Sequence, residues 1–169
     1  MWSPETISCR LLLPLGLALC LGGCFQPLYG GSGGAGLQAD LAAIAIDPIS
    51  DRLGHYLGDD LIYALNGSGS QVAPKYRLTV TLREHVQTPL VDTLSGRATA
   101  ATVTVDAYYR LVPADGGAPI TEGTAFTAAS YDRTAQRFAN IRAARDAEIR
   151  DAKTLADQIR TRLAIALQK

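Results

Sequence analysis

Two segments in the middle of the chain alternate between apolar and polar residues. In residues 76–82 the even positions are Tyr, Leu or Val, and Arg and Thr stand between them. In residues 97–112 the odd positions from 101 onward are Ala, Val, Tyr or Leu, and the even positions from 102 to 110 are Thr, Asp, Tyr or Arg. A period of two predicts strands with one buried face, which is typical of an antiparallel sheet.

Two further segments are predicted to be strands. Residues 41–46 (LAAIAI) form a short apolar run that Asp47-Pro48 closes, which favours a buried strand. The turn sequence PADGGAP at residues 113–119 leads into residues 120–130, which return as the next strand. Residues 84–95 contain Pro89 and alternate less clearly, so they form either a loop or an extension of the strand before them.

Helical periodicity marks two segments. In the first, Ser50 or Asp51 is suited to cap the N-terminus and Asn66-Gly67 to end the helix. Its apolar residues recur every three or four positions: Leu53, Leu57, Leu61 and Ala64 or Leu65. The second helix is predicted over about residues 139–167. Its predicted apolar stripe is Ile141, Ala144, Ile149, Ala152, Leu155, Ile159, Leu163 and Ala166.

The order of these segments predicts the fold class. It is strand, helix, three strands and helix, which gives an α+β two-layer sandwich with a mainly antiparallel four-stranded sheet and two helices on one face. The other face of the sheet would carry Thr, Tyr and Arg side chains. We expect solvent or a partner to cover that face.

The first residues of the chain have the pattern of an export signal. Residues 11–21 are almost continuously apolar, but this run is shorter than the ~20 residues that span a bilayer. It ends in Leu21-Gly22-Gly23-Cys24, which resembles a bacterial lipobox, with small residues before the cysteine that is acylated. The alternative is that Cys24 is an ordinary exported cysteine near a standard cleavage site.

These features predict three segments of the chain. Residues 1–23 are a lipoprotein signal peptide, residues 24–38 a lipidated tether with a Gly-rich linker, and residues 39–169 a single α+β domain. We expect a diacylglycerol and an N-acyl chain on Cys24 and no other cofactor, since two or more chains are needed for a lasting anchor. Phe25 follows Cys24, where an Asp would resemble an inner-membrane retention signal. The predicted location is therefore the outer membrane, facing the periplasm.

Composition and charge exclude several functions. The chain has 169 residues, with 16 Lys+Arg and 16 Asp+Glu. This balance argues against binding to nucleic acid, which requires a basic excess. His55 and His85 have no Cys or acidic ligand at metal spacing, and no catalytic arrangement is visible, so we expect neither a metal site nor an enzyme.

Four arginines are the candidates for binding an anionic ligand. Arg77, Arg83, Arg97 and Arg110 are expected on the open face of the sheet. Arginine in a strand flanked by threonine is suited to contact a phosphate, such as a lipid phosphate, but it equally suits a solvated sheet.

The sequence resembles a known family of envelope lipoproteins. Residues 24–30 read Cys-Phe-Gln-Pro-Leu-Tyr-Gly, which is similar to the start of mature LptE-type lipopolysaccharide-assembly lipoproteins, especially alphaproteobacterial ones. Those read Cys-Gly-Phe-x-Pro-Leu-Tyr, so this chain lacks one Gly. Residues 76–84 (YRLTVTLRE) and short stretches of the final helix, residues 144–147 and 155–163, add to the likeness.

The resemblance implies a function and its partners. Members of this family bind inside a large outer-membrane β-barrel, help to assemble it, and form with it the translocon that delivers lipopolysaccharide to the outer leaflet. The alternative is an auxiliary or pilot lipoprotein of another envelope transport or secretion complex. A pilot built only of helices would lack the alternation of residues 76–130.

Overall fold

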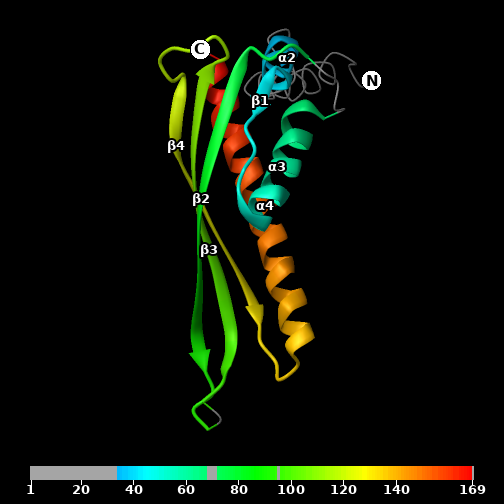
Figure 1. Ribbon diagram of the computed structural model, residues 1–169, viewed down its shortest axis with the longest axis vertical. Coiled ribbons are helices and arrows are strands. Elements are labelled where there is room, and N and C mark those ends of the chain that lie inside the picture. The colour runs from blue at the N-terminus through cyan, green and yellow to red at the C-terminus, as the bar shows by residue number, and fades with distance from the viewer. Residues whose placement is uncertain (1–33, 68–71, 95, 169) are drawn as a thin grey trace, which may run out of the picture. The chain divides into compact units, whose positions relative to one another are not determined.

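The computed structural model describes residues 34–67, 72–94 and 96–168. The predicted signal peptide, Cys24 and most of the tether lie outside these ranges. The described elements are α2 (Gly34–Ala42), β1 (Ile44–Ile46), α3 (Asp51–Asn66), β2 (Tyr76–Val91), β3 (Ala98–Pro113), β4 (Thr121–Asp132) and α4 (Arg137–Leu167). Leu37–Lys169 form one compact unit, in which α3 and α4 cover the same side of the sheet (Figure 1).

The sheet contains four strands in the order β1-β2-β3-β4. The α+β class and the strand number are as predicted, but the sheet is mixed. Strands β2, β3 and β4 are antiparallel neighbours, whereas β1 runs parallel to β2. The parallel pair arises because α3 carries the chain from the end of β1 back to the start of β2, a crossover that two parallel strands require.

The described residues form three helices rather than the predicted two. The segment predicted to be a strand over residues 41–46 begins as the end of α2, and only Ile44–Ile46 are extended. Leu37 and Leu41 stand four residues apart and are both buried, as on one face of a helix. A short apolar run does not distinguish a buried strand from a buried helix. Helix α2 begins at Gly34, inside the segment expected to be a linker.

The long central strands bury one face as predicted. Strand β3 places the odd residues from Ala101 to Leu111 in the core, all at 3% exposure or less. Strand β2 continues to Val91, so residues 84–91 extend the strand. Its pairing with β3 is regular as far as Gln87 and shifts between Gln87 and Leu90, on either side of Pro89.

Helix α3 packs on the sheet with the residues that its periodicity predicts. Leu53, Leu57, Leu61 and Leu65 are buried. Ser50 stands at the N-cap position in an extended conformation. Gly67 follows the helix at a φ of 62°, which is in the left-handed region that favours glycine.

The predicted stripe of α4 is correct only in its C-terminal part. Ala152, Leu155, Ile159 and Leu163 are buried, but Ile141 and Ile149 are 50% and 42% exposed. Ile149 lies beside the buried positions Ala147, Glu148, Asp151 and Ala152 but outside them. Helix α3 runs beside the C-terminal part of α4 and reaches Arg145, which lies over the Tyr56 ring, so Ile141 lies beyond it (Figure 1). The N-terminal part of α4 therefore has no second helix to cover its apolar residues.

This difference predicts unequal effects of two truncations within the same predicted stripe. Leu155→Ala, at a fully buried position, should lower the free energy of unfolding by ~2–5 kcal/mol, because it leaves a cavity. Ile141→Ala, at an exposed position, should change it by less than ~1 kcal/mol. Urea unfolding followed by circular dichroism measures both. Equal losses would contradict the described packing of α4.

Candidate interaction surface on the open sheet face

The open face of the sheet is polar with two exposed aromatic side chains. Tyr108 of β3 is 45% exposed, and Phe126 of β4 is 55% exposed. The same face contains a shallow depression of about 430 Å³, lined by Thr81, Arg83, Asp106, Tyr108 and Thr124. These side chains belong to three adjacent strands, and their alternation with buried residues aims them away from the helices.

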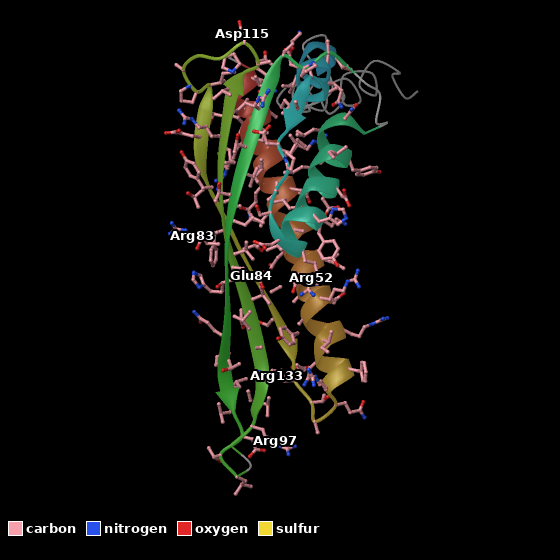
Figure 2. The ribbon with its side chains drawn as sticks, viewed as in Figure 1. Arg52, Arg83, Glu84, Arg97, Asp115 and Arg133 are labelled. Carbon is pink, nitrogen blue, oxygen red and sulfur yellow. The ribbon has the colours of Figure 1, made fainter. Side chains whose placement is uncertain are left out.

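The structure brings three of the four predicted arginines to this face. Arg77 and Arg83 lie on β2, and Arg110 lies on β3. Arg97 precedes β3 and lies at the far end of the β2–β3 hairpin, apart from Arg83 (Figure 2). The four therefore do not form one cluster.

The arginines on the open face are matched with carboxylates. Arg77 Nη1 lies 3.5 Å from Asp47 Oδ1, and Arg110 Nε lies 3.6 Å from Glu122 Oε2. Arg83 is directly opposite Asp106 in the β2–β3 register. Exposed ion pairs contribute only ~0–1 kcal/mol, so these arginines remain able to exchange a carboxylate for another anion.

Tyr108 joins the same network. Its hydroxyl donates a hydrogen bond of 3.1 Å to Glu122 Oε2. This hydrogen bond to the carboxylate raises the pKa of Tyr108. The face thus has mixed charge and many hydrogen-bonding groups, which suit a polar partner.

A second polar cluster lies on the helix side of the sheet. Arg52, in the first turn of α3, donates from Nε to Glu148 Oε2 of α4 at 2.8 Å, and its Nη2 donates to Oε1. Glu148 is 5% exposed. Glu84 of β2 points to the same side (Figure 2), and burial together with the Glu148 charge raises its pKa.

Asp151 is a buried acid on α4 beside this cluster. It is 1% exposed, and Thr127 Oγ1 of β4 donates to its Oδ1 at 2.9 Å. Its Oδ2 has no hydrogen-bond partner among the described residues. Burial raises the pKa of Asp151. Sequence reasoning missed this residue and the Arg52–Glu148 pair, because their partners are distant in the chain.

The two histidines lie apart. His55 Nε2 lies 3.5 Å from Asp59 Oδ2, one turn later on α3, whereas His85 lies on β2. In the part of the chain that the structure describes, no group of three or more His, Cys, Asp or Glu residues could hold a metal ion. No described helix is long and apolar enough to cross a membrane.

The fold and its polar open face define a small two-layer α+β domain, and sequence comparison gives its family. The family model LptE, described as lipopolysaccharide-assembly, matches residues 41–163. This match covers well over half of the chain, which therefore belongs to the LptE family. The resemblance seen in the sequence is confirmed. No curated protein sequence matches the chain.

Solved structures share the fold. A protein of Caulobacter crescentus CB15 named as a lipoprotein is 26% identical, with a TM-score of 0.65, and the match covers 79% of this chain and 96% of that one. A minor lipoprotein from Acinetobacter baumannii is 14% identical, with a TM-score of 0.53, over 72% of this chain and 90% of that one. The second likeness shows the fold alone.

The buried carboxyl of Asp151 predicts a dependence of stability on pH. An acid with a raised pKa in the folded state binds its proton more tightly there than in the unfolded chain. The free energy of unfolding should therefore rise as pH falls through the folded pKa of Asp151 towards its unfolded value. Asp151→Asn removes this titration and should flatten the slope.

Urea unfolding at a series of pH values between 7 and ~4 measures this slope. Thr127→Ser is the matched control, since it keeps both the carboxyl of Asp151 and a hydroxyl donor, and should retain the wild-type slope. An unchanged slope in Asp151→Asn would show that the raised pKa of Asp151 does not contribute.

Proposed function

We propose that this protein is an outer-membrane lipoprotein that plugs and helps to assemble a β-barrel translocon, which delivers lipopolysaccharide to the outer leaflet. The observation that carries the proposal is the match of residues 41–163 to the LptE family. A lipobox-like sequence ending at Cys24 supports a lipid anchor. The similarity to a protein of Caulobacter crescentus named as a lipoprotein supports it as well.

The open face has the chemistry that a barrel lumen requires. The interiors of outer-membrane barrels are polar. Thr81, Asp106, Tyr108 and Thr124 present hydroxyl and carboxylate groups around a shallow depression, with Arg83 among them. A face of mixed charge can form hydrogen bonds with a polar wall and avoids strong repulsion between like charges.

Lipopolysaccharide is the proposed anionic ligand of the arginines. Guanidinium groups bind phosphates through paired hydrogen bonds. Three of the arginines lie on one face: Arg77, Arg83 and Arg110. Arg77 and Arg110 form solvent-exposed ion pairs, and Arg83 is opposite Asp106 in the strand register. Arg97, at the end of the hairpin, would contact the ligand separately. The protein is proposed to bind and position rather than to catalyse.

The anchor can be tested through Cys24. Cys24→Ser in the full chain should abolish acylation and move the protein from the membrane fraction to the soluble fraction, because the acyl chains supply the membrane affinity. Metabolic labelling with palmitate and cell fractionation measure both effects. Ser32→Ala, in the Gly-rich segment, is the control and should leave both unchanged. Retention of label in Cys24→Ser would contradict the proposed anchor.

The partner can be tested by purification of the tagged, acylated protein from outer membranes in mild detergent. We expect a large β-barrel in a one-to-one ratio, identified by mass spectrometry. Recovery of an inner-membrane transporter or a secretin instead would favour the auxiliary or pilot class. Failure to recover any partner would leave the barrel proposal unsupported.

The arginine proposal predicts a specific loss of ligand affinity. Arg83→Ala combined with Arg110→Ala should weaken binding of purified lipopolysaccharide about tenfold, corresponding to ~1.4 kcal/mol. Arg137→Ala combined with Arg142→Ala, both on α4, removes the same two charges, is the control for net charge and should have little effect. Fluorescence titration of the full chain measures the dissociation constants. Equal weakening in both variants would indicate non-specific electrostatics.

A further inference from the structure

The sheet has two outer edges, and the structure leaves them in different states. One edge belongs to β4, which pairs only with β3. The other belongs to β2 beyond the short β1, which pairs only with residues 76–78 of β2. An open edge presents backbone donors and acceptors to which another strand can pair.

The edge of β4 is closed by side chains of α4. Arg150 Nη2 donates to the carbonyl of Ser130 at 3.1 Å, and Gln158 Nε2 donates to the carbonyl of Phe126 at 3.1 Å. Arg162 Nη1 donates to the carbonyl of Thr124. Donors eight residues apart on the helix reach acceptors four apart on the strand, and donors four apart reach acceptors two apart. The rise along helix and strand is nearly equal over these spacings, so the side chains of α4 follow the edge of β4.

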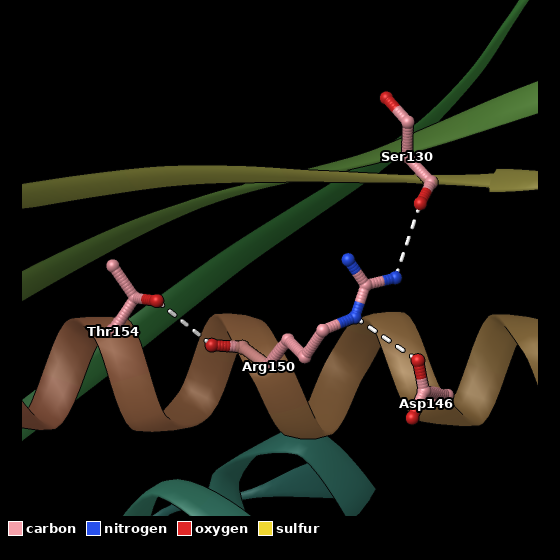
Figure 3. A network of polar contacts seen from close by, with 4 residues as sticks. All are labelled: Ser130, Asp146, Arg150 and Thr154. Atoms are coloured by element: carbon pink, nitrogen blue, oxygen red, sulfur yellow. Dashed lines mark hydrogen bonds and ion pairs between the residues drawn. The ribbon is translucent and has the colours of Figure 1, made fainter.

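Arg150 is itself held in place (Figure 3). Its Nε donates to Asp146 Oδ2 at 3.0 Å, one turn earlier on α4. Thr154 Oγ1 donates to the carbonyl of Arg150 at 2.9 Å. An incoming strand would have to displace these contacts, so strand addition at β4 is disfavoured.

Beyond Leu78, no side chain or strand of the described residues covers the edge of β2 in this way. The amide of Asp47 donates to the carbonyl of Leu78 at 2.9 Å, which shows that even residues of β2 aim their backbone groups outward. The next such residues are Val80, Leu82, Glu84 and Val86. Among the described residues, none forms a hydrogen bond with the outward backbone groups of these four. Residues 80–86 pair regularly with β3, so this stretch of edge contains no β-bulge.

The side chains along this edge define the strand that it would accept. On the helix side Leu82 is partly exposed and Val86 is 56% exposed. Glu84 stands between them. The charges that act on Glu84 are those of Glu148, Asp151 and Asp51, with Arg52 as the cation among them. An added strand with apolar residues on either side of a basic residue would complement this pattern.

A second copy of the chain is a poor occupant. Two copies paired antiparallel over residues 80–86 would share the midpoint of that stretch. Arg83 would then lie directly opposite Arg83, and like charges directly opposite each other destabilise a strand pair. Pairing of two copies over the whole of residues 80–86 is therefore disfavoured, whereas a strand of another protein with complementary charge avoids this repulsion.

We propose that the outer edge of β2 over residues 80–86 binds an extended segment of a partner protein by β-strand addition, with a basic residue of that segment against Glu84. The inference goes beyond the proposed function, since it holds for any partner that offers such a segment. Backbone hydrogen bonds would supply the affinity and the alternating side chains the selectivity.

The test uses the full acylated chain in detergent micelles and the peptide Thr-Val-Thr-Lys-Thr-Val-Thr. Amide hydrogen exchange is measured by NMR with and without peptide. In the free protein the amides of Val80, Leu82, Glu84 and Val86 should exchange quickly. Peptide should slow all four at least tenfold, whereas the odd residues are already bonded to β3 and should change little.

Two proline variants provide a matched pair. Val86→Pro removes an outward donor without removing a bond to β3, and should weaken peptide binding at least tenfold. Ala128→Pro makes the same change on the outer side of β4 and should leave peptide binding unchanged. Thermal unfolding checks that both variants are folded. Should Val86→Pro not fold, Glu84→Lys tests the same edge and should also weaken binding of the Lys peptide.

Several results would overturn the proposal. Slow exchange of the four amides in the free protein at all concentrations would mean that a segment of this chain already occupies the edge. Protection that increases with protein concentration would mean that a second copy does. Absence of peptide-dependent protection, or protection at β4 instead, would equally contradict it.

Discussion

The two-sided pairing of β3 is the constraint on which the rest of the structure depends. This strand bonds to β2 along one side and to β4 along the other. Its odd residues are buried beneath the helices, so a shift of either neighbour by one residue would expose an entire apolar face. The core thereby fixes the register of all three strands. It also fixes which of their side chains reach the open face.

The positions of the polar groups follow from that register. Because Tyr109 and Leu111 are buried, Arg110 between them must face outward, beside Glu122 of β4. The same parity places Arg83 outward and Glu84 towards the helices (Figure 2). Arg83 and Glu84 are adjacent in β2 but belong to different surfaces. Arg83 lies on the open face, and Glu84 belongs to the second polar cluster with Glu148.

Features that depend on the local periodicity of the sequence could be predicted from it. Features that depend on contacts between distant segments could not. Alternation predicted the buried face of β3, and helical spacing predicted Leu57 and its neighbours in α3. The parallel pairing of β1 and the Arg52–Glu148 bond join segments far apart in the chain, so no local pattern encodes them. Ile149 has the right spacing for a core residue, but the buried positions of α4 at this level are Ala147, Glu148, Asp151 and Ala152, so Ile149 is exposed.

The two edges of the sheet differ in how they are protected against pairing with another strand. An open strand edge exposes a protein to unwanted pairing, and natural proteins block such edges with charged residues, proline or a covering element. Helix α4 covers β4 with Arg150 and other side chains. On β2, Arg83 opposes pairing between identical copies, and Pro89 lies where the regular register ends. These devices limit self-association and the length of the free edge, but they leave residues 80–86 open to a strand of complementary charge, which is the property that a selective binding edge requires.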